Sequence, residues 1–275
     1  MATTLTAGRL GAGDIRARKG GMRLAMLTAY DYPTAMALEA AGVDIILVGD
    51  SLGEVELGFP TTRDVTLAMM AHHVRAVRNG APDTHVCGDM SADTYRTPWE
   101  AVESARVLVA AGADSVKLEG GLAPQVAAII ADGIPVIGHV GLLPQTAEVY
   151  RREGKTPDEA DRIAAEARAL DEAGCCAIVI EAVPAELAER ITREVGAPTI
   201  GIAAGLETDG QVLVSTDLIG QLPTVPRFVT PKADVFGAVV GAASAYVEEV
   251  RGAGVPVLAA VGGVAGAAGG MYRAG

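Results

Sequence analysis

The sequence predicts an eightfold β/α barrel, and three observations carry that prediction. Short apolar segments rich in β-forming residues alternate with amphipathic helical segments along most of the chain. These apolar segments are hydrophobic on both faces, as parallel strands covered on two sides must be. No glycine-rich dinucleotide fingerprint follows the first strand, and no change of composition marks a second domain. A doubly wound sheet is the alternative, which alternation alone does not exclude.

Seven segments are expected to form buried strands, and an eighth completes the ring. The seven are residues 24–30, 44–50, 85–90, 114–120, 134–140, 177–182 and 197–204, and the eighth is 225–229. Residues 98–113 and 157–174 are expected to be helices, because each begins at a proline and ends near a glycine. We therefore expect residues 1–250 to form one barrel domain with a short N-terminal extension. Residues 251–275 are expected to be a tail rich in glycine and alanine.

The composition limits the classes of partner. The chain has 275 residues, a formal net charge of −12 and a pI near 4.8. Such an acidic surface argues against nucleic acids and anionic membranes, since both call for clustered Lys and Arg. The first 21 residues have no apolar core of a secretory signal, and the three cysteines form neither a metal-spaced set nor a disulfide framework. These features predict a cytoplasmic protein that binds small molecules.

Polar residues recur at the C-terminal ends of the predicted strands, where a β/α barrel builds its active site. A polar residue inside a strand is costly unless it is paired, and a single one at a strand end is most simply a turn residue. A series of them at the same end of successive strands favours a functional site instead. The residues are Asp50, Ser51, Asp89, Lys117, Glu119, His139 and Glu181.

The residue types predict a magnesium site. Asp50, Asp89 and Glu119 offer hard oxygen ligands, which suit Mg²⁺. Zinc is disfavoured, because His139 is the one histidine of the group and no cysteine joins it in a known spacing. Lys117 could balance the acids or bind a substrate carboxylate as a point charge. Its alternative role is an ion pair with Glu119, two residues along the same strand.

Three further features each have a functional and a purely structural interpretation. Ser51 could donate a hydrogen bond to a substrate oxygen, or it could cap the helix that follows. Glu181 stands alone on an apolar strand, which suits a general acid or base, or it could pair with a distant Arg or Lys. The glycines of residues 201–210 could cradle a phosphate group, or they could serve tight turns and close backbone approach.

Several sequence blocks resemble, in the same order, the ketopantoate hydroxymethyltransferase family. They are LTAYDYPTA, ILVGDSLG, HVRAVRNGAP, SVKLEGG, PVIGHVGLLPQ, IEAVPAELAERIT and IGIAAGLETDGQVLV. The resemblance implies a (β/α)₈ TIM barrel of the phosphoenolpyruvate/pyruvate superfamily type, Mg²⁺ dependence and a decameric homo-oligomer. It also implies transfer of a hydroxymethyl group from 5,10-methylenetetrahydrofolate to 3-methyl-2-oxobutanoate. That reaction gives 2-dehydropantoate in pantothenate biosynthesis, through a metal-stabilised enolate.

The resemblance further implies roles for the metal and substrate ligands. Asp50 and Asp89 would bind the metal ion, and Glu119 would support it through water. Ser51 and Lys117 would hold the carboxylate of the 2-oxo acid. These roles agree with the residue types, because hard oxygens face the cation and two donors face the substrate anion.

Proton transfer would fall to Glu181 as the acid/base, with His139 near the new hydroxymethyl group. Phe59, Arg63 and Asp93 lie in stretches that depart from the family pattern, and they could reshape the acceptor or the donor side. The departures fall at residues 58–66, 89–95, 146–160, 216–217 and 226–231. They leave open an alternative function, which is a metal-dependent aldolase or C–C lyase, or a paralogue acting on a different 2-oxo acid.

Overall fold

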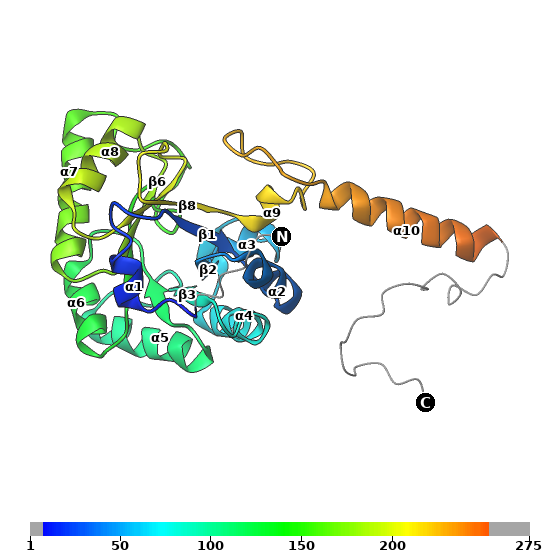
Figure 1. Cartoon of the computed structure of the whole chain (residues 1–275), viewed down its shortest axis with the longest axis horizontal. Coiled ribbons are helices and arrows are strands. Elements are labelled where there is room, and N and C mark those ends of the chain that lie inside the picture. The colour runs from blue at the N-terminus through cyan, green and yellow to red at the C-terminus, as the bar shows by residue number, and fades with distance from the viewer. Residues whose placement is uncertain (1–7, 253–275) are drawn as a thin grey trace.

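The strands close into a ring. In the computed structural model, which describes residues 8–252, eight parallel strands pair in chain order and β8 pairs with β1 (Figure 1). Closure excludes the doubly wound sheet and confirms the barrel. The strands are β1 (Leu24–Thr28), β2 (Ile45–Val48), β3 (His85–Asp89), β4 (Ser115–Lys117), β5 (Val136–Gly141), β6 (Ala177–Glu181), β7 (Thr199–Ile202) and β8 (Gly210–Leu213).

Helices follow most of the strands and surround the ring. Both predicted helices are present, and Thr97 and Thr156 cap them by accepting hydrogen bonds from backbone N–H groups in their first turns. The helices are α1 (Ala12–Arg16), α2 (Tyr32–Ala41), α3 (Leu52–Val55), the 3₁₀ helix η1 (Thr62–Asp64), α4 (Leu67–Gly80), α5 (Pro98–Ala111), α6 (Ala123–Ala131), α7 (Pro157–Glu172), α8 (Ala185–Glu194), α9 (Ser215–Leu218) and α10 (Val235–Gly252).

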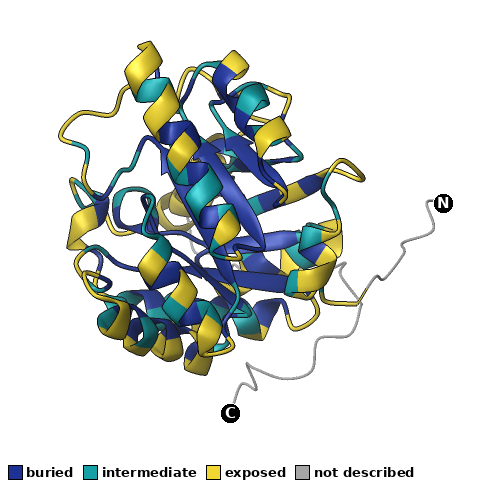
Figure 2. Cartoon of the chain, turned by 90° about the vertical axis from the view of Figure 1, so that its left-hand side faces the viewer, coloured by how far each residue is buried: buried dark blue, intermediate teal, exposed yellow. Residues whose placement is uncertain are grey.

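Each strand buries side chains on both faces. One set, which includes Met26, Ile45 and Ile137, fills the inside of the barrel together with Ile15 of α1. The alternate set, which includes Ile46 and Ile178, packs under the surrounding helices. Figure 2 shows the result, with buried strands inside and, around them, helices whose exposed residues lie on the outside. Burial on both faces explains why the strands read as continuous apolar runs.

The prediction for the eighth strand is wrong. Residues 225–229 form no strand, and β8 is Gly210–Leu213. The error arose because no helix separates β7 from β8, so the alternating pattern fails at this one connection. Residues 201–210, considered above as a phosphate cradle, supply the end of β7, the connection and the first residue of β8. A Cβ atom at Gly210 would lie 2.6 Å from the backbone oxygen of Leu24, so close backbone approach explains that glycine.

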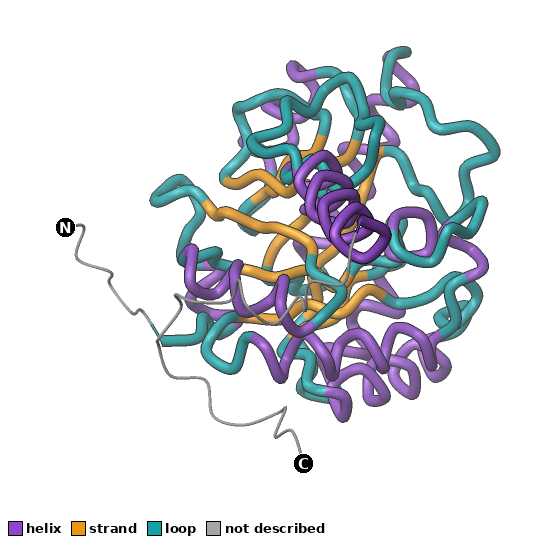
Figure 3. The backbone as a smooth tube through the Cα atoms, turned by 90° about the vertical axis from the view of Figure 1, so that its right-hand side faces the viewer, coloured by secondary structure: helices purple, strands orange, loops and turns teal. Residues whose placement is uncertain are grey.

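Helix α10 extends away from the barrel, and none of its residues is buried (Figure 1). Figure 3 looks toward the barrel from the side on which α10 projects. The predicted tail, residues 251–275, lies outside the described residues except for the last two residues of α10. Within residues 8–252, no helix combines the length and the apolar character needed to cross a bilayer.

Candidate active site

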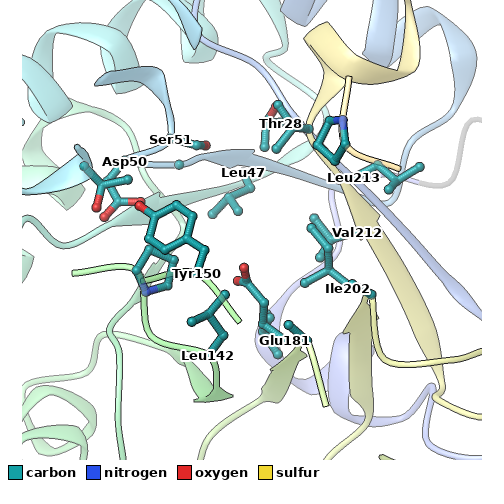
Figure 4. Close-up of a pocket in the computed structure, with 18 of the residues that line it drawn as sticks. Thr28, Leu47, Asp50, Ser51, Leu142, Tyr150, Glu181, Ile202, Val212 and Leu213 are labelled. Atoms are coloured by element: carbon teal, nitrogen blue, oxygen red, sulfur yellow. The ribbon is translucent and has the colours of Figure 1, made fainter. Parts of the chain in front are cut away.

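A cavity of about 680 Å³ opens at the C-terminal ends of the strands, where the sequence places the polar residues. All seven predicted site residues line it. Its remaining wall is largely apolar and includes Leu142, Ile202 and Val212. In Figure 4 the carboxylate of Glu181 points into the cavity between these apolar side chains, with Asp50 farther away. The cavity therefore has a charged part and an apolar part.

An ion pair lies at the charged end of the cavity. Nζ of Lys117 is 2.8 Å from Oδ1 of Asp89, and both side chains are almost fully buried. Lys117 therefore forms its ion pair with Asp89 and not with Glu119, which was the structural alternative considered for it. Burial alone would lower the pKa of Lys117, but the charges of Asp89, Glu119 and Asp50 outweigh it and raise that pKa above its ordinary value. Lys117 is therefore a permanent cation.

The acids at this end outnumber the cation. Burial, followed by the charge of Asp89, raises the pKa of Asp50 to about 8. Burial raises the pKa of Glu119 well above its ordinary value, although Lys117 opposes the effect. Oδ1 of Asp89 touches Lys117 but accepts no hydrogen bond of regular geometry from any described group. Three buried carboxyl groups beside one ammonium leave a deficit of positive charge.

That deficit fits a divalent cation. Within residues 8–252, no group of three or more His, Cys, Asp or Glu side chains is arranged to hold a metal ion together. Mg²⁺ usually keeps several waters and takes only one or two carboxylates, so a smaller set suffices. The side chains that could bind the cation offer only oxygen atoms. The raised pKa of Asp50, which is one of them, indicates that a negative charge is unfavourable at this position without a further cation. The residues present therefore fit Mg²⁺ bound by Asp50 and Asp89, with Glu119 acting through water.

Ser51 does not cap the helix that follows it. Its side chain makes no capping hydrogen bond to α3. Its Oγ lies 2.9 Å from the hydroxyl of Tyr30, and it lines the cavity. The capping interpretation is therefore wrong, and the hydroxyl of Ser51 is oriented by Tyr30 at the cavity wall.

His139 connects Lys117 with Glu181. Nδ1 of His139 is 3.4 Å from Nζ of Lys117, and Nε2 is 3.2 Å from Oε2 of Glu181. Burial and the positive charge of Lys117 lower the pKa of His139, so its ring is neutral. An ammonium can only donate, so we assign Nδ1 as the acceptor and place the ring proton on Nε2. Glu181, expected to stand alone or to pair with Arg or Lys, thus lies beside Nε2 of His139, in a contact that does not have regular hydrogen-bond geometry.

Gln145 is a site residue that the sequence analysis did not select. Its Nε2 donates to Oδ2 of Asp50 and to the backbone oxygen of Met90, each at 2.8 Å. Its backbone N–H donates to Glu119 at 3.0 Å, and its side-chain oxygen accepts from the hydroxyl of Tyr95. Gln145 lies inside the block PVIGHVGLLPQ, which was the one available signal. It fixes the orientation of both acids.

The mouth of the cavity is formed by the loop between β5 and α7 and by the segment after β8. Tyr150 comes from the former, and Phe228 from the latter. None of Phe59, Arg63 and Asp93 is among the cavity-lining residues. Arg63 donates to the backbone oxygen of Ala147 and so acts on the loop that carries Tyr150, while Asp93 pairs with Arg96 at the surface. A direct effect of these three on either substrate is therefore not supported.

Comparison with known proteins decides the family. The ketopantoate hydroxymethyltransferase family model matches residues 10–257. The chain belongs to this family. It is 49% identical over 244 residues to the 3-methyl-2-oxobutanoate hydroxymethyltransferase of Ignicoccus hospitalis, covering 86% of this chain and 93% of that protein. It is also 49% identical to the protein of the same name from Thermus thermophilus, covering 86% and 94%.

Solved structures with little sequence similarity share the fold of this family member. Phosphonopyruvate hydrolase matches with a TM-score of 0.62 and 15% identity, covering 93% of this chain and 92% of that one. A 2,3-dimethylmalate lyase of the PEP mutase/isocitrate lyase superfamily matches with a TM-score of 0.60 and 16% identity, covering 92% and 91%. At such low identity the likeness shows the barrel fold alone and supports no lyase activity for this chain.

Proposed function

We propose that this chain transfers a hydroxymethyl group from 5,10-methylenetetrahydrofolate to 3-methyl-2-oxobutanoate, giving 2-dehydropantoate for pantothenate biosynthesis. The observation that carries the proposal is the cavity itself, in which Glu181 faces an apolar wall beside a charged end. A branched 2-oxo acid has the same division, with a carboxylate and keto group at one end and an isopropyl group at the other. The family supplies the identity of the donor.

The charged end would bind and orient the acid. Mg²⁺ held by Asp50 and Asp89 would act as a Lewis acid toward the keto group. Lys117 and the hydroxyl of Ser51 would attract the substrate carboxylate, and Gln145 would keep Asp50 in place. The apolar wall would exclude water around the isopropyl group, which strengthens the electrostatic interactions nearby.

Glu181 would remove the proton from C3 of the acid, next to the keto group. The N–H that we assign to Nε2 of His139 would keep the carboxylate of Glu181 oriented toward that carbon. Water would hydrolyse the methylene bridge of the donor, which breaks both of its C–N bonds and leaves a one-carbon unit at the oxidation level of formaldehyde. The enolate would add to this carbon, and the new alkoxide would take up the proton removed from C3, so that one donor, one acid and one water give 2-dehydropantoate and tetrahydrofolate.

The direct test is turnover of the purified protein with both substrates and Mg²⁺, with 2-dehydropantoate identified by mass spectrometry. We expect chelation of Mg²⁺ to lower the rate by at least about 100-fold, because a Lewis acid contributes several kcal/mol to such reactions. Restoring Mg²⁺ should restore the rate. A higher kcat/KM with another 2-oxo acid, across a panel of branched, linear and aromatic acids, would overturn the assignment of the acceptor.

Helix α10 supports the prediction of a homo-oligomer. Large apolar side chains recur on it three and four residues apart, which forms one stripe along the helix. The stripe comprises Phe236, Val239, Val240, Tyr246, Val247 and Val250, all exposed in the single chain. A chain that left this stripe in water would be prone to association.

The barrel has a matching uncovered groove. Outward residues of the other strands, such as Ile46 and Ile178, are fully buried under helices. Those of β1 and β8 are not, because Ala25 is exposed and Leu27 is only partly buried, and a groove of about 320 Å³ runs there. The groove lies where the eighth outer helix of a barrel belongs. We infer that α10 of a second copy covers it, while the decamer stays a prediction from the family resemblance.

Replacing Val239 and Val250 together by Asp is expected to lower the assembly to a smaller species, because both charges would lie in the buried stripe. The molar mass is measured by size-exclusion chromatography with light scattering. Glu248→Gln, on the same helix, is the control and should leave the mass unchanged. An unaltered mass for the Asp variant would contradict this arrangement.

The division into domains at residue 250 and the cytoplasmic location also stay predictions.

A further inference from the structure

Asp217 is a buried carboxylate without a partner. It lies in α9, directly after β8, its residue exposure is 7%, and it lines the cavity. Within residues 8–252, its side-chain oxygens take part in no hydrogen bond and no ion pair. Its oxygens are not among the fully enclosed unpaired atoms of the described residues, so they are accessible from the cavity that Asp217 lines. A buried polar group is normally paired, and in this cavity water or a ligand can pair with the carboxylate.

The position of Asp217 separates it from the charged end of the cavity. The strands follow one another around the ring in chain order, so β8 lies across the barrel from β4, which carries Lys117. Glu181, on β6, lies between the two sides. A ligand at Asp217 would therefore approach the reacting carbon from the side opposite the substrate carboxylate.

The surroundings of Asp217 define the ligand it can take. Val214, Leu222 and Pro226, which are near Asp217 in the sequence, also line the cavity and offer apolar surface to a flat ring. A carboxylate only accepts hydrogen bonds, and its two oxygens match a pair of N–H donors that point the same way. The volume, about 680 Å³, suits a drug-sized ligand and exceeds what a five-carbon acid fills.

The donor of the proposed reaction carries such a pair. Its pteridine ring has a 2-amino group beside an N3–H group, both on one edge and both donors. We propose that Asp217 binds this edge of 5,10-methylenetetrahydrofolate and so positions the one-carbon unit over the enolate. The inference rests on the proposed function, and it makes Asp217 a residue that selects the donor.

The test measures the effect of Asp217 on use of the donor separately from its effect on the acceptor. Asp217→Asn keeps the shape but turns an NH₂ group toward the two N–H donors of the ring. We expect the KM for 5,10-methylenetetrahydrofolate to rise about 30- to 100-fold, because a buried charged acceptor is lost. Exchange of the C3 proton of 3-methyl-2-oxobutanoate in D₂O, which needs no donor chemistry, should stay within about twofold. Asp158→Asn, on the outer surface of α7, removes the same charge and should change neither quantity.

A ligand analogue distinguishes contact from a structural effect. With 5,10-methylenetetrahydrofolate whose 2-amino group is replaced by methyl, the wild type should lose affinity and Asp217→Asn should lose little more. An unchanged KM, equal discrimination by both proteins, or loss of proton exchange in the variant would each overturn the proposal. Failure of the wild type to use the natural donor would overturn the proposed function instead. Binding of tetrahydrofolate to both proteins by calorimetry then still decides the role of Asp217.

Discussion

Glu181→Gln is expected to lower the rate of C3 proton exchange by about 10²- to 10⁴-fold, which is the usual contribution of a positioned general base. The amide keeps the size of the side chain and can still contact Nε2 of His139, but it cannot accept the substrate proton. The rate is measured by proton NMR in D₂O with Mg²⁺ and 3-methyl-2-oxobutanoate, first without the donor and then with tetrahydrofolate present.

The control for this variant is Glu54→Gln. Glu54 is another carboxylate on the cavity wall, where it accepts a long hydrogen bond from Tyr150 at 3.5 Å. Its loss should change exchange by less than about threefold, because its side-chain hydrogen bond is to Tyr150 and not to any of the residues proposed to bind the acid. Retention of exchange in Glu181→Gln, or equal loss in both variants, would show that another group removes the proton.

Lys117→Met is expected to destabilise the fold by roughly 3–5 kcal/mol, because it leaves Asp89 buried without its cation. For a chain of this size that loss corresponds to a Tm lower by roughly 6–20 °C. The same change should abolish binding of the 2-oxo acid, since the proposed anchor for its carboxylate is gone. Thermal unfolding is recorded without Mg²⁺ and at one protein concentration, because bound metal and association both add stability.

A second substitution separates stability from function. Adding Asp89→Asn to Lys117→Met removes the stranded charge, so most of the lost stability should return. Activity should not return, because the substrate anchor and one proposed metal ligand are both missing. If the single variant unfolds at the wild-type temperature, the pair is not the buried, dry interaction that its 2.8 Å contact indicates.

Residues at strand ends could be predicted from the sequence for a geometric reason. In a closed parallel barrel every strand ends at the same rim, so Asp89, Lys117 and Glu181 converge although they are far apart in the chain. Their order along the chain then gives their order around the cavity. Side-chain partners could not be predicted in this way. Lys117 contacts Asp89 and not Glu119 because the register between β3 and β4 places Asp89 opposite Lys117.

Residues in loops were harder to predict, because no period constrains them. Gln145 follows β5 in a loop, so nothing in the pattern indicated that it would reach back to Asp50 and Glu119. The eighth strand was missed for a related reason. Gly210–Leu213 is short and follows β7 without a helix, while residues 225–229 have an apolar pattern but contain Pro226, which cannot donate to a strand ladder.

The direct connection from β7 to β8 makes one short stretch serve two purposes. Residues 210–217 both complete the ring, through pairing with β1, and supply Asp217 to the cavity. The free energy of ring closure and the free energy of ligand binding therefore depend on the same backbone. Weakening the pairing of β1 with β8 at Gly210 would lower the affinity for a ligand at Asp217 without altering any atom that contacts the ligand. Conversely, a ligand bound at Asp217 would stabilise the pairing of β1 with β8 that closes the barrel.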